Sequence, residues 1–410
     1  MKWLLLASAT LSAIRNVSAL IRFPCAQLVT ERFDPLVTPG QVAPHLHQII
    51  GGLEVLNIEL IQSSFNLSMD PSLDLPNVAT CTTCKFKEDK SNYWTAVLYF
   101  KHPNGSFIRV PQIPNHVTGN PDGGMTVYYI QPPDLSPTVA FRPGFRMITG
   151  NPMVRRRSTK LDPRSPEAWA SSFRCWDTPG FFDLSNSFAP GAGPYDTVEL
   201  PNKPCPYGIR ANLFFPSCWD GVNLDTPDHS SHVAYMEGVV NPNAGIFLQR
   251  GTCPKTHPVR IPMLFYETVW DTAQFTHLWP KDGSQPFVLS MGDPTGYGHH
   301  GDYVFGWEGD SLQRAMDKCG ASILGLPDSC PELTQISDEE MNSCKVPVMV
   351  DEITEGQYLD ALPGCNPVQQ GPDPATMIRS CTAVSTTSLP KATPAAGANV
   401  AAEAVVTPVA

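Results

Sequence analysis

The chain has 410 residues, of which 28 are Lys or Arg and 39 are Asp or Glu, giving a net charge of −11. This sign excludes a nucleic-acid-binding protein that works by neutralising phosphates. The 42 prolines argue against a long helical bundle, because proline breaks helix interiors. Hydrophobic residues make up 42% of the chain and can fill a core, which excludes disorder over most of it.

The N-terminus has the pattern of a secretory signal peptide. Lys2 supplies the positive start, residues 3–14 are apolar, and residues 17–19 are small or aliphatic, as signal peptidase requires. We therefore assign residues 1–19 to a signal peptide. No apolar run reaches the ~20 residues of a membrane span, so we predict a secreted mature chain without a transmembrane segment.

The cysteines fit the same compartment. All 12 lie beyond the signal peptide, and an even number in a secreted chain predicts disulfide bonds. The spacing of Cys81 and Cys84 is also that of a redox or zinc motif, but an oxidising compartment favours structural bridges. Asn66 and Asn104 begin N-glycosylation sequons, which fits the secretory route.

Short β-type runs recur between clusters rich in Pro, Gly, Asn and Asp. Residues 94–100 and 107–110 flank a turn with Asn104 and Gly105, which predicts a hairpin. Further strands are predicted at 125–130, 139–148, 209–215, 232–236, 259–267, 287–291 and 303–307. Many short strands with long loops predict a mainly β fold, a single β-sandwich or jelly-roll-like domain.

Few helices are predicted. One begins after Asp310, and a second has a capping box formed by Ser337 and Glu340. Beyond residue 320 the chain becomes polar and carries four cysteines, and the eight before it are also an even number. The simplest hypothesis has a β-rich main domain at 20–320, a disulfide-stapled helical and loop extension at 321–381, and a disordered low-complexity tail at 382–410. Bridges that cross residue 320 would argue against this split.

Histidines, carboxylates and aromatic residues gather in three distant motifs. His45 and His47 share one face if their segment is extended. The second motif runs from Trp219 to His232, and the third lies in a glycine-rich segment around His300. The catalytic candidates are Asp220, Asp225, Asp228, His232, His300 and Asp302, and the substrate-binding candidates are His45, His47, Trp219, Tyr297, Tyr303 and Trp307. We expect the motifs to converge on one cleft, because loops build the sites of β-sandwiches.

Several chemistries fit these groups. Two carboxylates could hydrolyse a glycosidic bond, with Asp220 and Asp302 as the first candidates for acid and base. A histidine or tyrosine base could instead abstract a proton from a uronic acid, as in a lyase. Three histidines, or histidines with aspartates, could bind a divalent metal. The groups could also serve only as hydrogen-bond anchors of loops. The sequence assigns no metal ligand and no cofactor.

The same segments resemble a known family. The carrying motifs begin at Arg32-Phe-Asp-Pro, His45-Leu-His, Cys205-Pro-Tyr-Gly, Phe215-Pro-Ser-Cys-Trp-Asp-Gly and Gly292-Asp-Pro-Thr-Gly. Their order and spacing over residues 22–320 resemble the secreted, mainly fungal family catalogued as domain of unknown function nineteen-ninety-six. The resemblance implies an extracellular fungal protein, and His300 rather than His299 aligns with the characteristic histidine. It brings no established activity.

Together these observations predict a secreted carbohydrate-active protein that cleaves or binds a fungal or plant cell-wall polysaccharide. Aromatic rings stack on the CH-rich faces of sugars, which is why aromatics beside carboxylates fit a carbohydrate cleft. If the protein is an enzyme, a glycoside hydrolase or a polysaccharide lyase is expected. The alternatives are a non-catalytic protein for wall binding or host interaction, and a histidine-rich metal-binding protein.

Overall fold

The computed structural model describes residues 20–53, 74–113, 123–132, 136–180, 183–243, 245–246, 251–319 and 325–378. The predicted signal peptide, the sequon at Asn66 and the predicted tail lie outside the described residues. The first strand begins at Leu20, directly after the expected signal, and all six of its residues are buried.

The first large sheet is antiparallel throughout, with the strand order β1-β8-β16-β12-β10-β11. Its strands are β1 (Leu20–Cys25), β8 (Met125–Ile130), β16 (Met263–Trp270), β12 (Ile209–Phe214), β10 (Ser171–Cys175) and β11 (Asp196–Thr197). Strand β16, which comes late in the chain, lies between two strands that precede it.

The second large sheet has the order β2-β3-β5-β18-β9, with β4 paired to β3. Its strands are β2 (Val29–Glu31), β3 (His47–Leu53), β4 (Cys81–Thr82), β5 (Asn92–Ala96), β18 (Gly301–Val304) and β9 (Arg146–Thr149). Two three-stranded sheets complete the fold. They comprise β17 (Phe287–Leu289), β6 (Leu98–Lys101) and β7 (Phe107–Arg109), and β14 (Val233–Ala234), β13 (Cys218–Trp219) and β15 (Val259–Arg260).

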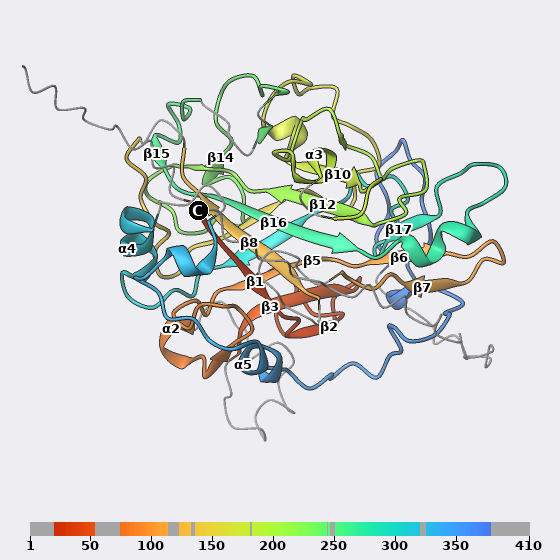
Figure 1. Cartoon of the computed structure of the whole chain (residues 1–410), viewed down its shortest axis with the longest axis horizontal. Helices are drawn as coiled ribbons and strands as arrows, with labels where there is room; N and C mark the ends of the chain where they lie inside the picture. The colour runs from red at the N-terminus through yellow and green to blue at the C-terminus, as the bar shows by residue number, and fades with distance from the viewer. Residues whose placement is uncertain are drawn as a thin grey trace, which may run out of the picture.

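The two large sheets pack against each other around the largest apolar cluster. This cluster takes Phe23 and Leu264 from the first sheet and Ile50 and Tyr303 from the second. The hydroxyl of Tyr266 on β16 donates a hydrogen bond to the backbone oxygen of Asp302 on β18 at 2.7 Å, which ties the two layers together. The prediction of a mainly β, sandwich-like fold is therefore confirmed (Figure 1).

The helices are few and short, and they lie around the sheets (Figure 1). Both helices expected from capping signals are present, and the Ser337 hydroxyl accepts the Glu340 N–H at 3.1 Å. The described helices are α2 (Leu75–Val78), α3 (Leu184–Ser187), α4 (Ser311–Lys318) and α5 (Asp338–Ser343), with 3-10 turns η2 (Glu167–Trp169), η4 (Ala273–Leu278), η5 (Pro327–Ser329) and η6 (Pro363–Cys365). No described helix is long and apolar enough to cross a membrane.

Each of the predicted runs overlaps a strand of the structure, but the bounds of these strands often differ from the prediction. The hairpin is confirmed as β6 and β7, with Tyr99 opposite Arg109. The run 94–100, however, is interrupted at Val97, where the chain leaves the second large sheet for a smaller one. The predicted strand at 139–148 is wrong over most of its length, because only β9 pairs, with β18.

Five disulfides are described: Cys25–Cys84, Cys81–Cys344, Cys175–Cys205, Cys218–Cys253 and Cys319–Cys330. Cys81 and Cys84 bond to different partners, so they form no redox pair. Two bridges cross residue 320, and the idea that the last four cysteines form a separate set is wrong. The chain after α5 packs back on the second sheet, where Val346 and Cys344 join a cluster with Leu28 and Trp94. The domain boundary itself remains a prediction.

The core holds a carboxyl group whose charge should make stability depend on pH. Asp89 is fully buried and accepts hydrogen bonds from the Tyr93 hydroxyl at 2.6 Å and the Ser91 N–H at 3.0 Å. Burial raises its pKa to about 7 from an ordinary value of 3.8. Because the folded state then binds the proton more tightly than the unfolded state, this group's contribution to stability falls as pH rises from 3.8 through 7.

We therefore expect Asp89→Asn to flatten the pH dependence of unfolding. Asp89 alone should cost about 3 kcal/mol of unfolding free energy between pH 5 and pH 8. Urea unfolding of the wild type and the variant at both pH values measures the difference. Asp162→Asn, at an exposed site, is the matched control. An equal pH dependence in the wild type and Asp89→Asn would contradict the prediction.

Candidate functional site

Three histidines from distant segments meet beside the second large sheet. We call His45, His47 and His300 the histidine triad. His47 begins β3 and lies opposite Ala96 on β5. On the other side of β5, Gly301 lies opposite Thr95, which places His300 next to Ala96 as well. The small Ala96 side chain leaves room above β5 for the imidazoles to approach one another.

The triad is compact and closed to solvent. The ring centroids of His45 and His47 lie 4.2 Å apart, and those of His45 and His300 lie 5.0 Å apart. One ring nitrogen from each histidine lies within 4.8 Å of those of the other two. All three residues are buried. The His45 and His47 rings lie together although His45 precedes β3 in a bend, and His300 joins them across 255 residues of sequence.

Hydrogen bonds to the backbone determine which nitrogens are free. His47 Nδ1 lies 2.9 Å from the Phe33 oxygen, and His300 Nδ1 lies 2.8 Å from the Gly298 oxygen. A carbonyl oxygen only accepts, so both Nδ1 atoms carry the hydrogen and both Nε2 atoms keep a lone pair. His45 Nε2 lies 3.1 Å from His300 Nε2 and must be the donor of that pair. The buried Nε2 of His47 has no hydrogen-bond partner.

Burial keeps the triad uncharged. It lowers the pKa of His47 to about 3 and that of His300 to about 4. The pKa of His45 is held well below its usual value by burial and by the neighbouring His47 and His300. Near neutral pH the site therefore presents neutral imidazoles, the form that binds metal ions.

The geometry is close to that of a three-histidine metal centre. Two nitrogens bound to one tetrahedral zinc ion at about 2.0–2.1 Å lie about 3.3 Å apart. The Nε2 atoms of His45 and His300 are 3.1 Å apart, close to this separation, and the ligand nitrogens of all three histidines lie within 4.8 Å of one another. The backbone bonds to the Nδ1 atoms of His47 and His300 are the outer contacts that orient metal-binding imidazoles in known centres.

Two buried carboxyl groups also belong to the second large sheet and its loops: Asp302 lies on β18, and Asp34 follows β2. Asp302 on β18 is fully buried, and its Oδ2 has no hydrogen-bond partner. Burial raises its pKa well above the usual value, and the neighbouring Asp34 carboxyl raises it further. Burial also raises the pKa of Asp34 to about 6. Asp34 was not among the residues selected from the sequence, although it lies within the Arg32-Phe-Asp-Pro motif.

The acidic residues of the central motif organise their own loop. Asp220 accepts the N–H groups of Val222 and Asn223, at 2.8 and 2.9 Å. Asp228 accepts the N–H groups of Ser230 and Ser231. These contacts fit the alternative in which the carboxylates anchor loops, and catalytic roles for Asp220 and Asp228 remain predictions.

The other two candidates of this motif lie beside the second sheet. Asp225 contacts His229 Nδ1 at 2.7 Å. His232 is fully buried, with its Nδ1 3.1 Å from the Thr226 hydroxyl. The backbone oxygen of His229 accepts the Ile148 N–H of β9, which joins this segment to the sheet. No direct contact links Asp225 or His232 to the triad among the described residues, so convergence of all the candidates on one cleft remains a prediction.

A cleft of about 660 Å³ opens beside the triad. Its charged lining residues are Arg156, Arg157 and Glu167, and Tyr297 and His299 also face it. Leu213 and Val233 contribute apolar surface, while hydroxyl groups such as Ser171 contribute polar surface. His299 thus lines the cleft, whereas the next residue, His300, belongs to the triad. The cleft is large enough for a ligand of oligosaccharide size.

The predicted aromatic contacts divide between the cleft and the core. Tyr297 lines the cleft. Trp219, Tyr303 and Trp307 are buried in the main apolar cluster, and the Trp307 indole donates to the Tyr129 hydroxyl at 2.9 Å. Among these four, Tyr297 alone is therefore placed to touch a ligand in this cleft. Among the lining residues, the sequence marks Arg156 and Arg157 as part of a run of three arginines, which could be a processing site, a contact to acidic sugars or a solvated loop. Glu167 on η2 and Ser171 on β10 belong to no motif.

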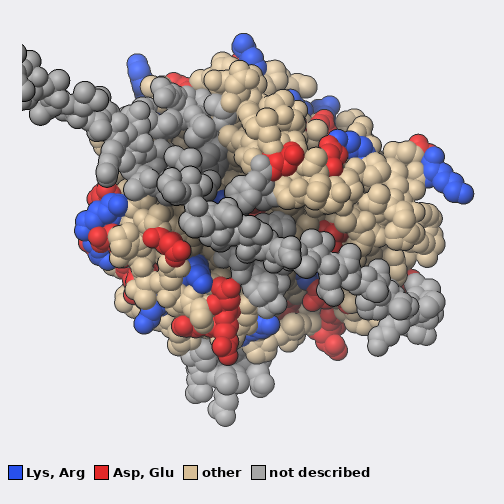
Figure 2. Space-filling view, viewed as in Figure 1, with Lys and Arg blue, Asp and Glu red and all other residues tan. Residues whose placement is uncertain are grey.

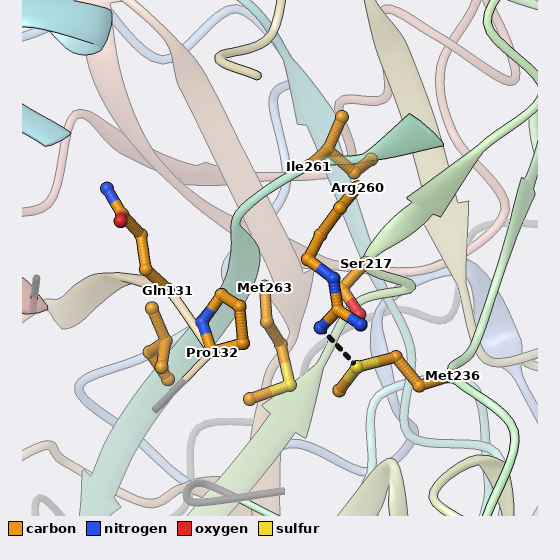
Figure 3. Close-up of a pocket in the computed structure, with 8 residues that line it drawn as sticks. Gln131, Pro132, Ser217, Met236, Arg260, Ile261 and Met263 are labelled. Atoms are coloured by element: carbon orange, nitrogen blue, oxygen red, sulfur yellow. Dashed lines mark hydrogen bonds between the residues drawn. The ribbon is translucent and has the colours of Figure 1, made fainter. Parts of the chain in front are cut away.

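Other features of the surface are less suited to a ligand. A hollow of about 10 Å³ between Arg260, Met236 and Met263 has room for about one water molecule (Figure 3). Arg260 Nη1 lies 3.0 Å from the Met236 sulfur there. On the face drawn in Figure 2, the described acidic and basic side chains are interspersed. The cleft and the triad are therefore the features best suited to bind a ligand or an ion.

Comparison with known proteins agrees with the motif resemblance. The family model described as a domain of unknown function, DUF1996, matches residues 34–307, which is more than half of the chain. No curated protein and no solved structure matches. The matched range contains all three triad histidines, both buried carboxyl groups and every lining residue of the cleft.

Proposed function

The chain belongs to the DUF1996 family, and we propose that its histidine triad binds one divalent transition-metal ion. This proposal rests on the Nε2 atom of His47, which is buried beside two other imidazoles and has no hydrogen-bond partner. An unsatisfied buried polar atom costs about 1–3 kcal/mol, and a bound ion would remove that cost. Imidazole ligands suit zinc and copper.

The burial of the triad suggests what the ion would do. Metal sites that perform catalysis keep a position open to water or substrate, whereas structural sites are closed. Since all three histidines are buried, the proposed ion would act mainly as a cross-link between the start of β3 and the segment before β18. An ion that binds only the folded chain raises its stability in proportion to the logarithm of its concentration.

We expect the full chain, produced without a polyhistidine tag, to retain one zinc or copper ion after dialysis. His47→Ala and His300→Ala should each weaken binding by about 100-fold or more, because each removes a ligand. Elemental mass spectrometry gives the stoichiometry, and thermal unfolding with and without zinc gives the stabilisation.

The exposed His277 on η4 supplies the matched control, since His277→Ala should keep the ion. Substoichiometric metal in the wild type after dialysis against zinc and against copper would overturn the proposal. Equal binding by the wild type and His300→Ala would also overturn it.

The cleft supports a second candidate, a secreted protein that cleaves or binds cell-wall polysaccharide. Apolar surface beside hydroxyl groups and Tyr297 matches the mixed character of sugar rings. The disulfides support a protein that works in an oxidising, extracellular compartment. A polysaccharide screen with product analysis by mass separates a hydrolase, which adds water, from a lyase, which leaves unsaturated ends, and from a binder, which cleaves nothing.

A further inference from the structure

We infer that the cleft selects an anionic glycan, a chain bearing uronate carboxylates, and that Arg156 and Arg157 recognise these carboxylates. This inference rests on the carbohydrate proposal for the cleft and is independent of the metal proposal. It names the substrate class and the residues that determine it.

The cleft is locally basic in an acidic protein. The chain carries a net charge of −11, yet the charged residues that line the cleft are two arginines and one glutamate. Among the described residues, neither arginine forms an ion pair with a carboxylate. A ligand carboxylate would therefore meet guanidinium groups whose charge is not already neutralised.

Arg157 is held in place before any ligand arrives. One of its terminal nitrogens, Nη2, donates to the backbone oxygens of Pro163 at 2.9 Å and Ala168 at 3.4 Å. Its guanidinium also lies over the Trp169 ring, 5.3 Å from the centroid. These contacts use neutral acceptors and a π face, so they position the guanidinium without cancelling its charge. A planar guanidinium can then bind a carboxylate through two parallel hydrogen bonds.

Arg156 supplies a second positive charge. Its side chain is exposed, and it lines the same cleft as Arg157. Successive carboxylates along a uronate chain could therefore meet two guanidinium groups, one held by backbone hydrogen bonds and one exposed to solvent.

The remaining lining tolerates an acidic chain. Glu167 is the one carboxyl that lines the cleft among the described residues, and burial raises its pKa above the ordinary value. The Tyr297 hydroxyl donates a hydrogen bond to Glu199, a carboxylate that does not line the cleft. Thr149 and Ser230 offer hydroxyl groups to the sugar.

The test compares oligogalacturonates with neutral cello-oligosaccharides of the same length, by calorimetry on the full chain. We expect the wild type to bind the uronate chain more tightly, with affinity that falls as salt increases. Arg156→Gln should weaken uronate binding about tenfold and leave neutral binding unchanged. Arg157→Lys keeps the charge but loses the paired hydrogen bonds, and should also weaken it. Arg164→Gln, at an exposed arginine paired with Asp162 and absent from the cleft lining, is the control.

The results of this test distinguish failure of the uronate inference from failure of the carbohydrate or metal proposal. Binding of neutral and uronate chains with equal affinity, or unchanged uronate binding in Arg156→Gln, would overturn the inference and leave the carbohydrate proposal standing. Binding of neither chain would overturn both. Metal content measured on the same samples reports the triad separately, and Arg156→Gln should keep the wild-type value.

Discussion

Gly51→Ala is expected to prevent stable folding, with a loss of more than about 5 kcal/mol in unfolding free energy. Gly51 lies in β3 at φ +114, a conformation that residues with a side chain rarely adopt. A Cβ at this position would lie 1.8 Å from the backbone oxygen of Ser91, beside the strand that β3 pairs with. Because the obstacle is backbone, relief would require β3 and β5 to separate.

Gly105→Ala is the matched control for this effect. Gly105 also has a positive φ, +97, but open space surrounds the position of its Cβ. Its loss should be limited to conformational strain, about 1–2 kcal/mol. Yield of folded protein and urea unfolding measure both variants. If Gly51→Ala unfolded at the same urea concentration as Gly105→Ala, the close approach of β3 and β5 would be refuted.

The second large effect concerns the bridge between Cys81 and Cys344, which spans 263 residues. Replacing both cysteines by serine should cost about 5 kcal/mol, because the unfolded chain regains the freedom of a very long loop. The same double replacement at Cys319 and Cys330, which span 11 residues, should cost only about 3 kcal/mol.

Denaturant unfolding of the two double variants gives the comparison, and replacing both members leaves no free thiol in either. Equal losses would show that loop length does not determine the contribution of these bridges. A greater loss at the short bridge would reverse the predicted order and contradict the chain-entropy account.

The sequence predicted the strands with strong local signals better than those defined by tertiary pairing. Residues 125–130 are rich in β-branched and aromatic residues, and β8 has these bounds. The sequence did not predict β1, because its residues directly follow the apolar predicted signal peptide and include Pro24. The break at Val97 has no local signal either, since it arises where two sheets separate. Disulfide partners cannot be deduced from spacing, which is why the pairing of Cys81 with Cys344 was unforeseen.

For the candidate site, the sequence predicted which residues belong to it better than how those residues are arranged in space. The histidine motifs contain all three triad members, although His45 lies in a bend before β3 and not in an extended strand. That His300 would complete the set depends on β18 pairing with β5, a contact across some 200 residues. Asp34 gave no signal of its burial, and the lining of the cleft depends on how irregular segments are placed.

The order of the strands has a consequence for synthesis. In the second sheet, β18 lies between β5 and β9, although both emerge from the ribosome long before it. Until residues 301–304 are made, the facing edges of β5 and β9 have no partner, and such edges recruit other chains. The gap between β5 and β9 therefore stays open from the end of β9 at residue 149 until β18 begins at residue 301, while more than a third of the chain is made. We therefore expect that chaperones that shield strand edges determine how much of the protein folds correctly.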